Sequence, residues 1–360
     1  MRHKYQKDKG PGWLFHPFEF AFCGYSGSGK TRVIITLIRN LSPKYKIGFV
    51  KHDVHGFEMD RKGKDTYLAM SSGASSLLIS GQFHFAEIHS NPVNIIRQNI
   101  SLLDADLLLI EGYKNSNIPK FIFVDQKRRI LKEFYKYQWK NILGFVGSQK
   151  NAIKDLSGYP YYYKEDITGI QNKILEIISE RIRNIHIFGL VLTGCKSAQM
   201  KREKSTLIYH EDSKIRYCYQ LLSKLCQKVY ISIREEQASN DYCHGLPQIH
   251  DQFLGMGPIG GILTAMVLHP NAAWLVLGCD LPFADLGILT RLVQERNPLK
   301  MATAYIQYPD GFPEPFCTLY EPKIRPRFFN CLGLGYTTPL KTLMNAEIQT
   351  ITLRDGDELI

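Results

Sequence analysis

The chain has 360 residues and a formal net charge of +11, with 45 lysines and arginines against 34 aspartates and glutamates. This length favours two domains, and a hydrophobic content of 44% allows each of them to bury a core. The longest apolar runs have only the length of a strand, which excludes a membrane span, and the sequence contains no internal repeat or low-complexity tract.

The basic residues and the cysteines narrow the classes of partner. Lysines and arginines are spread along the chain without a recognised nucleic-acid motif, so a solvated surface is the simpler interpretation of the charge. A basic chain also suits polyanionic small ligands such as triphosphates, and we favour these over nucleic acid. The eight cysteines form no CxxC pair and are interpreted as reduced thiols, mostly in the core, with no metal site.

The first segment of the chain is basic but does not resemble a signal peptide. Pro11, Pro17 and Glu19 interrupt the stretch that would have to be apolar. We therefore expect a cytoplasmic protein with no membrane partner.

A phosphate-binding loop follows the first predicted strand, residues 18–22. Residues 24–31 read GYSGSGKT, which matches G-x-x-x-x-G-K-[ST], and apolar residues at helical spacing come next. The glycines let backbone N–H groups turn towards phosphates, Lys30 contributes a cation, and the Thr31 hydroxyl can hold Mg²⁺. The alternative, a glycine-rich turn with an accidental lysine, is disfavoured by the flanking strand and helix. The expected nucleotide-binding residues are Gly24, Gly27, Ser28, Gly29, Lys30 and Thr31.

Two more strands of this half are predicted at residues 47–50 and 107–110. Because strands alternate with helices, we expect a parallel sheet, and ligands bind outside the carboxyl ends of such strands. Lys51, His52, Asp53 and Glu111 would then rim the P-loop pocket, where Glu111 would order a water or the metal. His52 and His55 are either a pair of metal ligands or, more simply, polar loop residues that position a phosphate or a partner.

The first half also resembles a known family, the molybdopterin-guanine dinucleotide biosynthesis adaptor proteins (MobB). The resemblance rests on the P-loop, on VKHDVHGFEMDRKGKDTY at residues 50–67 and on LLLIEGYK at residues 107–114. The family's D-x-x-G-K-D pattern falls on Asp60, Gly63, Lys64 and Asp65. The resemblance implies a GTP-binding domain with weak hydrolysis that assists a partner enzyme or delivers molybdopterin.

The first domain is predicted to end with strands at residues 121–124 and 142–146 and a helix at residues 170–178. A polar segment, residues 179–184, follows this helix, and a new strand begins at Ile185 or His186 and runs to Leu192. Because a strand–loop–helix pattern restarts there, we place the boundary near residue 183. The predicted domains are residues 1–183, with the P-loop, and residues 184–360, a second nucleotide-binding α/β domain.

The second half places polar groups where predicted strands end. A loop at residues 192–204 leaves the first strand and carries cations near its end. Asp251 precedes a glycine-rich loop, residues 255–261, which opens a helix. A buried strand at residues 274–277 ends close to Asp280, and a carboxylate at the carboxyl end of a central strand is placed to bind Mg²⁺ on a triphosphate. The alternative is that Asp280 only caps the turn before the next proline.

Together these segments resemble the molybdenum cofactor guanylyltransferases (MobA), a family with a Rossmann-like nucleotidyltransferase fold, over residues 186–322. The family's signature loop, L-A-G-G-x-S-x-R-M-G-x-D-K, is matched at Leu192, Gly194, Ser197, Met200 and Lys204. Its G-P-[LIM]-x-G segment matches residues 257–261, its guanine-side aspartate matches Asp251, and the aspartate of its C-D-x-P segment matches Asp280. The expected architecture is therefore α/β, with a P-loop NTPase-like parallel sheet followed by a Rossmann-like nucleotidyltransferase domain.

This second resemblance implies guanylyl transfer, in which the terminal phosphate of molybdopterin attacks the α-phosphorus of GTP and pyrophosphate leaves. Such a reaction needs positioning and charge neutralisation more than covalent help. Lys204 would neutralise the triphosphate, Asp251 would accept hydrogen bonds from guanine or ribose, and Asp280 would hold the Mg²⁺ that polarises the α-phosphate. Lys204 and Asp280 are thus the expected catalytic residues. The expected GTP-binding residues of this domain are Leu192, Thr193, Gly194, Lys204, Asp251 and Asp280, and the expected metal ligands of the chain are Asp280 and Thr31.

The main departures of the signature loop from the family are Cys195, Gln199 and Lys201, which replace Gly, Arg and Gly, and Glu203 replaces Asp as a milder change. A Cβ at Cys195 hinders close phosphate approach, and the loss of the arginine removes a fork suited to phosphate oxygens. The family's N-x-N near its C-terminus is also missing, and Asp355 is a candidate replacement as a metal ligand.

Two functions from different classes stay open. The leading hypothesis is a fused adaptor and guanylyltransferase that makes the guanine dinucleotide form of the cofactor from GTP. The alternative is a non-catalytic GTP-binding adaptor whose degenerate transferase domain only binds cofactor or a partner. A generic P-loop kinase would leave Asp251 and Asp280 unexplained. Expected ligands are GTP, Mo-molybdopterin and Mg²⁺; further candidate partners are molybdoenzymes, their chaperones and a second copy of the chain, and the choice between GTP and CTP is open.

Overall fold

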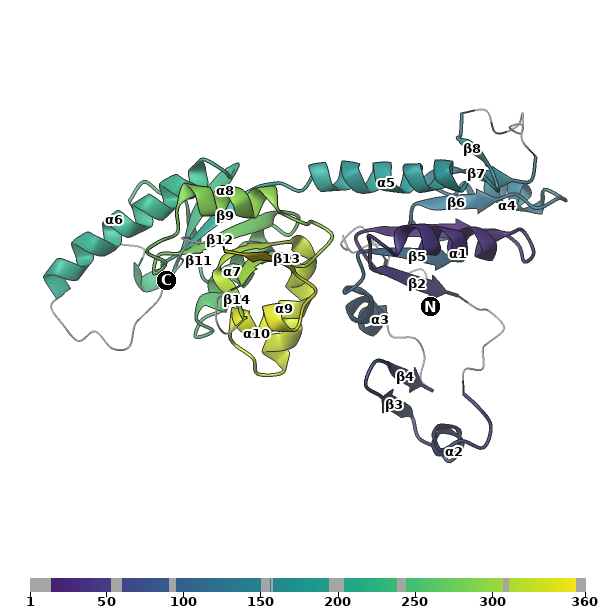
Figure 1. Ribbon diagram of the computed structural model, residues 1–360, viewed down its shortest axis with the longest axis horizontal. Coiled ribbons are helices and arrows are strands. Elements are labelled where there is room, and N and C mark those ends of the chain that lie inside the picture. The colour runs from purple at the N-terminus through teal and green to yellow at the C-terminus, as the bar shows by residue number, and fades with distance from the viewer. Residues whose placement is uncertain are drawn as a thin grey trace. The chain divides into compact units, whose positions relative to one another are not determined.

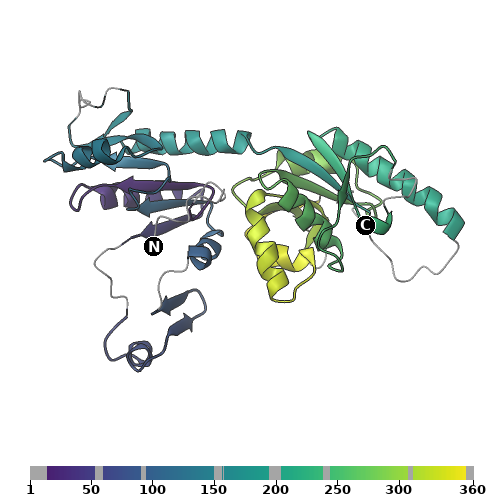
Figure 2. The same ribbon diagram turned by 180° about the vertical axis from the view of Figure 1, so that it is seen from behind.

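Figure 1 and Figure 2 show the computed structural model of the chain from opposite sides. The structure describes residues 14–52, 60–90, 95–149, 156, 158–193, 204–237, 244–306 and 311–353. Its contacts divide the chain into two compact units: Met1–Leu41, Ile47–Leu102 and Leu108–Asp166 in the first, and Ser42–Lys46, Leu103–Leu107 and Ile167–Ile360 in the second. Both units are α/β folds, as the sequence predicts. In the described part of the chain, no helix is long and apolar enough to cross a membrane.

A six-stranded sheet forms the centre of the first unit. Its strands are, in spatial order, β2 (Ile47–Lys51), β5 (Leu107–Glu111), β1 (Glu19–Cys23), β6 (Lys120–Phe123), β7 (Ile142–Gly147) and β8 (Tyr161–Tyr163). β1 pairs in parallel with β5 and β6, and the pairs β6–β7 and β7–β8 are parallel too. All five residues of β1 are buried, because a central parallel strand is covered on both faces. The strands that the sequence predicts for this half are confirmed.

Helices connect these strands, among them α1 (Lys30–Leu41), α3 (Ile95–Leu102) and α4 (Arg129–Tyr137). α1 buries Val33, Ile34 and Leu37, the apolar residues at helical spacing, and so anchors the turn that precedes it. α4 is amphipathic in the same way: it buries Ile130 and Phe134 and leaves charged side chains on its outer face.

A smaller substructure, which the sequence analysis did not predict, lies between β2 and β5 along the chain. It consists of α2 (Asp65–Ser71) and an antiparallel hairpin of β3 (Ser76–Ser80) and β4 (Phe85–His89). Asp60 shapes the turn before α2, because its Oδ1 accepts hydrogen bonds from the Arg61 N–H at 2.8 Å and the Thr66 hydroxyl at 2.9 Å. The hairpin leaves Leu78 63% and Phe85 73% exposed. Two strands are too few to bury these side chains on their own.

The helix predicted at residues 170–178 is longer than expected. α5 (Ile167–Arg183) buries three isoleucines at four-residue spacing, Ile170, Ile174 and Ile178. The prediction of a polar connection at residues 179–184 is wrong, because α5 includes most of that segment and its polar side chains lie on the exposed side of the helix. The contacts group α5 with the second unit, and the boundary expected near residue 183 stays a prediction.

A seven-stranded mixed sheet forms the centre of the second unit. Its strands are, in spatial order, β11 (Gln248–His250), β10 (Lys228–Ile233), β9 (Ile187–Leu192), β12 (Ala273–Gly278), β14 (Pro313–Tyr320), β13 (Ala302–Ile306) and β15 (Gln349–Thr352). β14 runs antiparallel to β12 and β13, and the four other pairs are parallel. β9 and β12 confirm the strands predicted after residue 184 and at residues 274–277.

Alternating residues of this sheet face two layers of helices (Figure 1). α6 (Lys204–Ser223) and α8 (Leu286–Gln294) cover one face, where Leu222 and Leu289 share an apolar core with Leu275 of β12. α7 (Pro258–Leu268) and α9 (Arg325–Gly333) cover the other face, which carries the fully buried Trp274. Because β12 is buried on both faces, its carboxyl end has a fixed position at the edge of the sheet.

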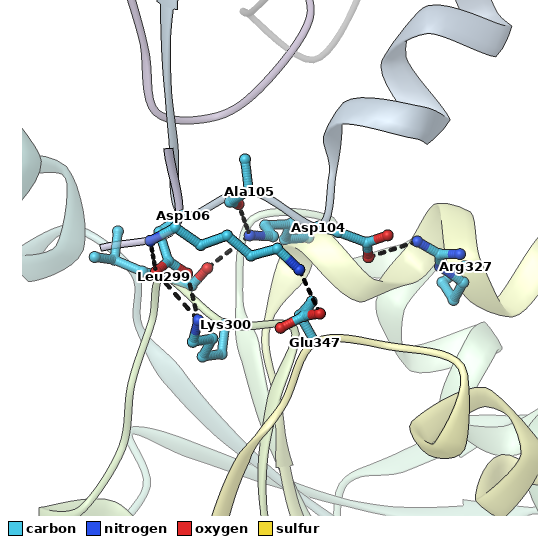
Figure 3. Close-up of polar contacts among 9 residues, drawn as sticks. Asp104, Ala105, Asp106, Leu299, Lys300, Arg327 and Glu347 are labelled. Atoms are coloured by element: carbon cyan, nitrogen blue, oxygen red, sulfur yellow. Dashed lines mark hydrogen bonds and ion pairs between the residues drawn. The ribbon is translucent and has the colours of Figure 1, made fainter. Parts of the chain in front are cut away.

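Polar contacts hold the segments Ser42–Lys46 and Leu103–Leu107 in the second unit (Figure 3). The buried Lys323 amine donates hydrogen bonds to the backbone oxygens of Ala105 at 2.7 Å and Leu299 at 2.6 Å. Burial lowers the pKa of Lys323 to about 8. Three ion pairs complete the set: Lys300–Asp106, Lys46–Glu347 and Arg327–Asp104.

Candidate functional site

The P-loop joins the end of β1 to the start of α1. Gly27 and Gly29 have φ angles of 76° and 94°, in the left-handed region that favours glycine. A Cβ at Gly24 would lie 2.9 Å from the backbone oxygen of Phe123, so a side chain is excluded there as well. The backbone therefore requires all three glycines, as expected for a loop whose N–H groups turn towards phosphates.

Lys30 is buried at the start of α1 and lies close to Glu111 at the end of β5. Its Nζ donates a hydrogen bond to the Tyr25 backbone oxygen at 2.8 Å and lies 3.9 Å from Glu111 Oε1. Burial lowers the pKa of Lys30, and the negative charge of Glu111 opposes that shift. The Thr31 hydroxyl donates a hydrogen bond to Glu111 Oε2 at 3.0 Å. Glu111 thus lies beside both the cation and the hydroxyl of the P-loop.

Lys51 ends β2, His52 follows it directly, and both are exposed, whereas Asp53 lies outside the described residues. The His52 N–H donates a hydrogen bond to the Glu111 backbone oxygen at 3.1 Å, and its ring centroid lies 4.9 Å from that of Tyr113. Gly112 has a φ of 110°, which lets the chain turn sharply after Glu111. The expected rim residues are therefore adjacent, whereas His55 lies outside the described residues.

The P-loop and the end of β5 offer oxygen ligands that suit Mg²⁺. The Thr31 hydroxyl and the Glu111 carboxylate lie within hydrogen-bond distance of each other. Mg²⁺ keeps several waters and binds nucleotide phosphates, so it needs only one or two protein oxygens. Among the described side chains, no group of three or more His, Cys, Asp or Glu could hold a metal. The donor set fits Mg²⁺ bound together with a nucleotide, and does not fit a cage made of protein ligands alone.

In the second unit, the carboxyl ends of β9, β10 and β12 lie at one edge of the sheet. Leu192 is the register partner of Ser232 in β10 and of Gly278 in β12. A cavity of about 220 Å³ opens there, between the strand ends and the loop before α7. Its lining includes Leu192, Thr193, Ser232, Arg234, Asp251 and Pro258. Three of the residues expected to bind GTP therefore share one cavity.

Asp251 is the carboxylate of this cavity. Its Oδ1 accepts a hydrogen bond from the Ser232 hydroxyl at 2.7 Å, and the Thr193 hydroxyl donates to the Ser232 backbone oxygen at 2.6 Å. Burial raises the pKa of Asp251, while the Ser232 hydrogen bond and the charge of Arg234 oppose that shift. Oδ2 makes no hydrogen bond to the described residues, so it is the oxygen left for a ligand.

A glycine lets α7 pack directly against this carboxylate. A Cβ at Gly261 would lie 2.1 Å from Ser232 Oγ and 3.2 Å from Asp251 Oδ1. The loop before the helix turns at Gly257, with a φ of 62°, and Pro258 starts the helix, where no N–H is needed. The Gly260 N–H donates a hydrogen bond to the Gly257 backbone oxygen at 3.0 Å, so α7 begins with a tight turn whose residues Gly257 and Pro258 line the cavity.

Asp280 does not line this cavity. It is exposed and lies two residues beyond β12, and the preceding Cys279 N–H donates a hydrogen bond to the Leu192 backbone oxygen at 3.4 Å. Lys204 is the first residue of α6. Five positions lie outside the described residues: Gly194, Cys195, Gln199, Lys201 and Asp355.

Sequence reasoning missed Ser232 and Arg234. The signal was present, because Val229, Ile231 and Ile233 alternate with less apolar residues, which is typical of a half-buried strand. The rule that places ligands at the carboxyl ends of parallel strands then points to the polar residues there. The hydrogen bond from Ser232 to Asp251, however, joins two strand ends that no local pattern connects.

Comparisons with known proteins agree with this two-part organisation. Residues 20–147 match the family model of molybdopterin guanine dinucleotide synthesis protein B (MobB). Residues 189–347 match that of the MobA-like NTP transferase domain. The chain joins a MobB domain to a MobA-like NTP transferase domain.

Curated relatives resemble parts of the chain. A molybdenum cofactor biosynthesis bifunctional protein of Synechocystis sp. is 34% identical over 165 residues, which are 46% of this chain and 48% of the relative. A molybdopterin-guanine dinucleotide biosynthesis adapter protein of Haemophilus influenzae is 30% identical over 109 residues, 29% of this chain and 61% of the relative. A molybdenum cofactor guanylyltransferase of Rhizobium johnstonii is 30% identical over 125 residues, 33% of this chain and 57% of the relative. The chain thus spans less than two thirds of the length of each of these relatives.

Proposed function

We propose that this protein transfers GMP from GTP to Mo-molybdopterin, which gives molybdopterin guanine dinucleotide and pyrophosphate. The observation that carries the proposal is the cavity that gathers Leu192, Thr193 and Asp251 at the strand ends of the MobA-like domain. The attached MobB domain supports the same pathway, because relatives of both kinds are named for the biosynthesis of the molybdenum cofactor or its guanine dinucleotide.

In this proposal the groups around the cavity have different roles in binding and catalysis. Asp251 Oδ2 accepts hydrogen bonds from guanine or ribose, and backbone N–H groups of residues 192–194 hold the nucleotide. Lys204, at the start of α6, neutralises the triphosphate. The terminal phosphate of molybdopterin then forms a bond to the α-phosphorus, and the bond to pyrophosphate breaks. Positioning and charge neutralisation supply most of the rate in such a transfer.

Mg²⁺ is the proposed metal of both domains. When bound, it withdraws charge from the phosphates of GTP. Asp280 would hold it in the transferase domain, where an exposed carboxylate fits an ion that also binds waters and phosphates. Thr31 and Glu111 would hold it in the MobB domain, where they already contact each other.

The MobB domain is proposed to bind a second GTP as an adaptor. The Lys30 amine, which donates to the Tyr25 backbone oxygen, would turn to a phosphate oxygen in the complex. Lys51 and His52 would contact the ligand from the rim of the pocket. Hydrolysis there would be slow, and the domain would serve to hold nucleotide or cofactor.

The deciding experiment incubates the full chain with GTP, Mg²⁺ and Mo-molybdopterin and follows release of pyrophosphate together with the guanine dinucleotide. The wild-type chain should release both in equal amounts, and Asp251→Ala should not. Lys30→Ala is the matched control: it should abolish binding in the P-loop and leave the transfer reaction. Strong GTP binding to the MobA-like domain without any pyrophosphate would sink the enzymatic proposal and support the non-catalytic adaptor.

Variants of the signature loop give a second test that distinguishes the transferase from the non-catalytic adaptor. A triple variant with Cys195→Gly, Gln199→Arg and Lys201→Gly restores the family's residues. A large rise in transfer would show that the natural loop is degenerate, and an unchanged rate would show that it already works. The same assay with CTP in place of GTP measures nucleotide choice.

Partners and location are part of the proposal. GTP as substrate fits a cytoplasmic protein that passes the finished cofactor to molybdoenzymes or their chaperones. A second copy of the chain is a further proposed partner, which the exposed Leu78 and Phe85 of the hairpin support. Light scattering of the wild type and of a Leu78→Ser/Phe85→Ser variant tests self-association.

A further inference from the structure

The MobB domain has a second polar cavity that none of the expected nucleotide-binding residues line. It measures about 400 Å³ and lies between the segment after β5 and the outer face of α4. Its lining consists of Lys114, Asn115, Lys132, Glu133, Lys136 and Tyr137. Pockets of this size hold small organic ligands in other proteins.

The charge of this cavity is positive. Its single carboxylate, Glu133, is already engaged by the Lys114 amine and the Tyr25 hydroxyl. Lys132 and Lys136 are four residues apart on α4, so they project from the same side of the helix. Neither makes an ion pair or a hydrogen bond within the part of the chain that the structure describes. Two neighbouring cations without a counter-charge favour an anion between them.

One wall of the cavity is a flat aromatic ring. Tyr137 is 55% exposed and lies nearly parallel to Trp139, with ring centroids 6.4 Å apart and 15° between the planes. Trp139 is buried, and its indole N–H donates a hydrogen bond to Asn115 Oδ1 at 2.9 Å. Trp139 supports the tyrosine ring, and the Lys136 amine lies 5.2 Å from the ring centroid of Tyr137. A planar ligand that stacks on Tyr137 would take the place of this cation–π contact and leave Lys136 for the phosphate.

We propose that this cavity binds a phosphate ester of a planar heteroaromatic ring, with the phosphate at Lys132 and Lys136 and the ring against Tyr137. The choice of a pterin as that ring rests on the proposed function, whose acceptor substrate carries both a pterin and a terminal phosphate. Glu133 links the cavity to the P-loop through Tyr25, so the pterin phosphate is held next to the nucleotide pocket of the same domain. The MobB domain is then a holder of the acceptor as well as of GTP.

The test is a fluorescence titration of the full chain with 6-hydroxymethylpterin monophosphate. Saturating GTP and Mg²⁺ keep the probe out of the nucleotide pockets. The ester should bind saturably and at least tenfold more tightly than 6-hydroxymethylpterin, which lacks the phosphate. Lys132→Gln/Lys136→Gln should remove that difference, because phosphate contacts supply it, and Tyr137→Leu should weaken both probes.

A matched control separates the site from the general charge of the chain. Lys127→Gln/Lys140→Gln removes the same charge from exposed positions near α4 that do not line the cavity, and it should leave the affinity within twofold of the wild type. The proposal is overturned if the ester binds no better than the alcohol, or if both double variants weaken binding equally. All four lysines are exposed, and thermal melts confirm that each variant folds.

The outcome is distinguishable from failure of the proposed function. Pyrophosphate release from GTP in the presence of Mo-molybdopterin, without binding of the pterin phosphate at α4, rejects only this cavity. Binding of the pterin phosphate that depends on Lys132 and Lys136, in a chain that releases no pyrophosphate, keeps the cavity and rejects the transferase.

Discussion

Gly261 in α7 offers the sharpest test of how the transferase cavity is built. In Gly261→Ala, the new methyl group would lie 2.1 Å from Ser232 Oγ and 3.2 Å from Asp251 Oδ1. Ordinary contacts between such atoms begin near 3.4 Å, so the serine hydroxyl has to move by about an ångström. It cannot do so without releasing Asp251, because the same hydroxyl donates the 2.7 Å hydrogen bond to the carboxylate.

Two opposing contributions determine how much Gly261→Ala changes the free energy of unfolding. Overpacking of a well-packed site costs about 1–3 kcal/mol, while alanine in place of glycine inside a helix gains about 0.5–1 kcal/mol. We expect a net loss of about 1–2 kcal/mol in the free energy of unfolding of the second unit. A hydrogen bond to a charged group contributes about 1.5–3 kcal/mol, so release of Asp251 should weaken GTP binding in this domain by about tenfold or more.

Urea denaturation followed by Trp274 fluorescence, in a background that lacks the other two tryptophans, measures the loss of stability. GTP titrations in a Lys30→Ala background, which removes binding in the P-loop, measure the loss of affinity. Gly333→Ala is the matched control, because a Cβ there would meet no atom within 4 Å. It should leave both quantities unchanged or raise stability slightly.

The double variant Gly261→Ala/Ser232→Ala tests whether the collision with the Ser232 hydroxyl causes the loss of stability. It removes the hydroxyl that collides, so stability should recover most of the loss, although Ser232 Cβ remains 3.1 Å from the new methyl group. GTP affinity should stay low, because Asp251 still lacks its partner. Gly261 does not serve this packing role if Gly261→Ala behaves like Gly333→Ala, or if the double variant is as unstable as Gly261→Ala alone.

Three further predictions each change one side chain. Asp251→Asn should raise the free energy of unfolding at pH 7, because burial raises the Asp251 pKa and ionisation of the carboxyl therefore opposes folding. Urea titrations should show that this gain disappears as the pH falls below 3.8, the ordinary pKa of an aspartate. The affinity for GTP should be reduced at every pH. Glu111→Gln should weaken Mg²⁺-dependent GTP binding of the MobB domain about tenfold in calorimetry and leave Mg²⁺-free binding nearly unchanged. The free energy of unfolding of the wild type should rise between pH 8 and pH 10.5, because burial lowers the Lys323 pKa from 10.5 to about 8 and the unfolded chain therefore binds the proton more tightly. Urea titrations of Lys323→Met should not show this rise.

The sequence predicted those parts of the structure that depend on local rules. The P-loop needs glycines because Gly27 and Gly29 adopt positive φ, a constraint that acts within the loop itself. The central strands are continuous apolar runs because both faces of a parallel strand are covered, which makes β1, β5 and β12 visible in the sequence. Glu111 lies beside Thr31 because Glu111 ends β5 and Thr31 follows the carboxyl end of the neighbouring parallel strand, β1.

The parts that the sequence did not reveal depend on distant neighbours. β11 has only three residues, and its place in the sheet is set by pairing with β10 and not by an apolar pattern. The role of Gly261 depends on a strand far away in the sequence, so it appears locally only as a poor helix former. The end of α5 was misplaced for a similar reason, since polar residues on the exposed side of a helix resemble those of a loop.

Both domains pair a carboxylate with a hydroxyl, and the difference between the two pairs indicates what each carboxylate does. Glu111 accepts a hydrogen bond from the Thr31 hydroxyl and lies beside the buried amine of Lys30. A metal ion that binds there can replace the hydroxyl proton as the partner of the Glu111 carboxylate. Asp251 is half-buried, its pKa is raised, and its Oδ1 already accepts a hydrogen bond from the Ser232 hydroxyl. A carboxylate so placed suits the N–H and O–H groups of a base or sugar better than a hydrated cation. In the proposed function, the exposed Asp280 is therefore the metal ligand of the transferase domain, and Asp251 recognises the nucleotide.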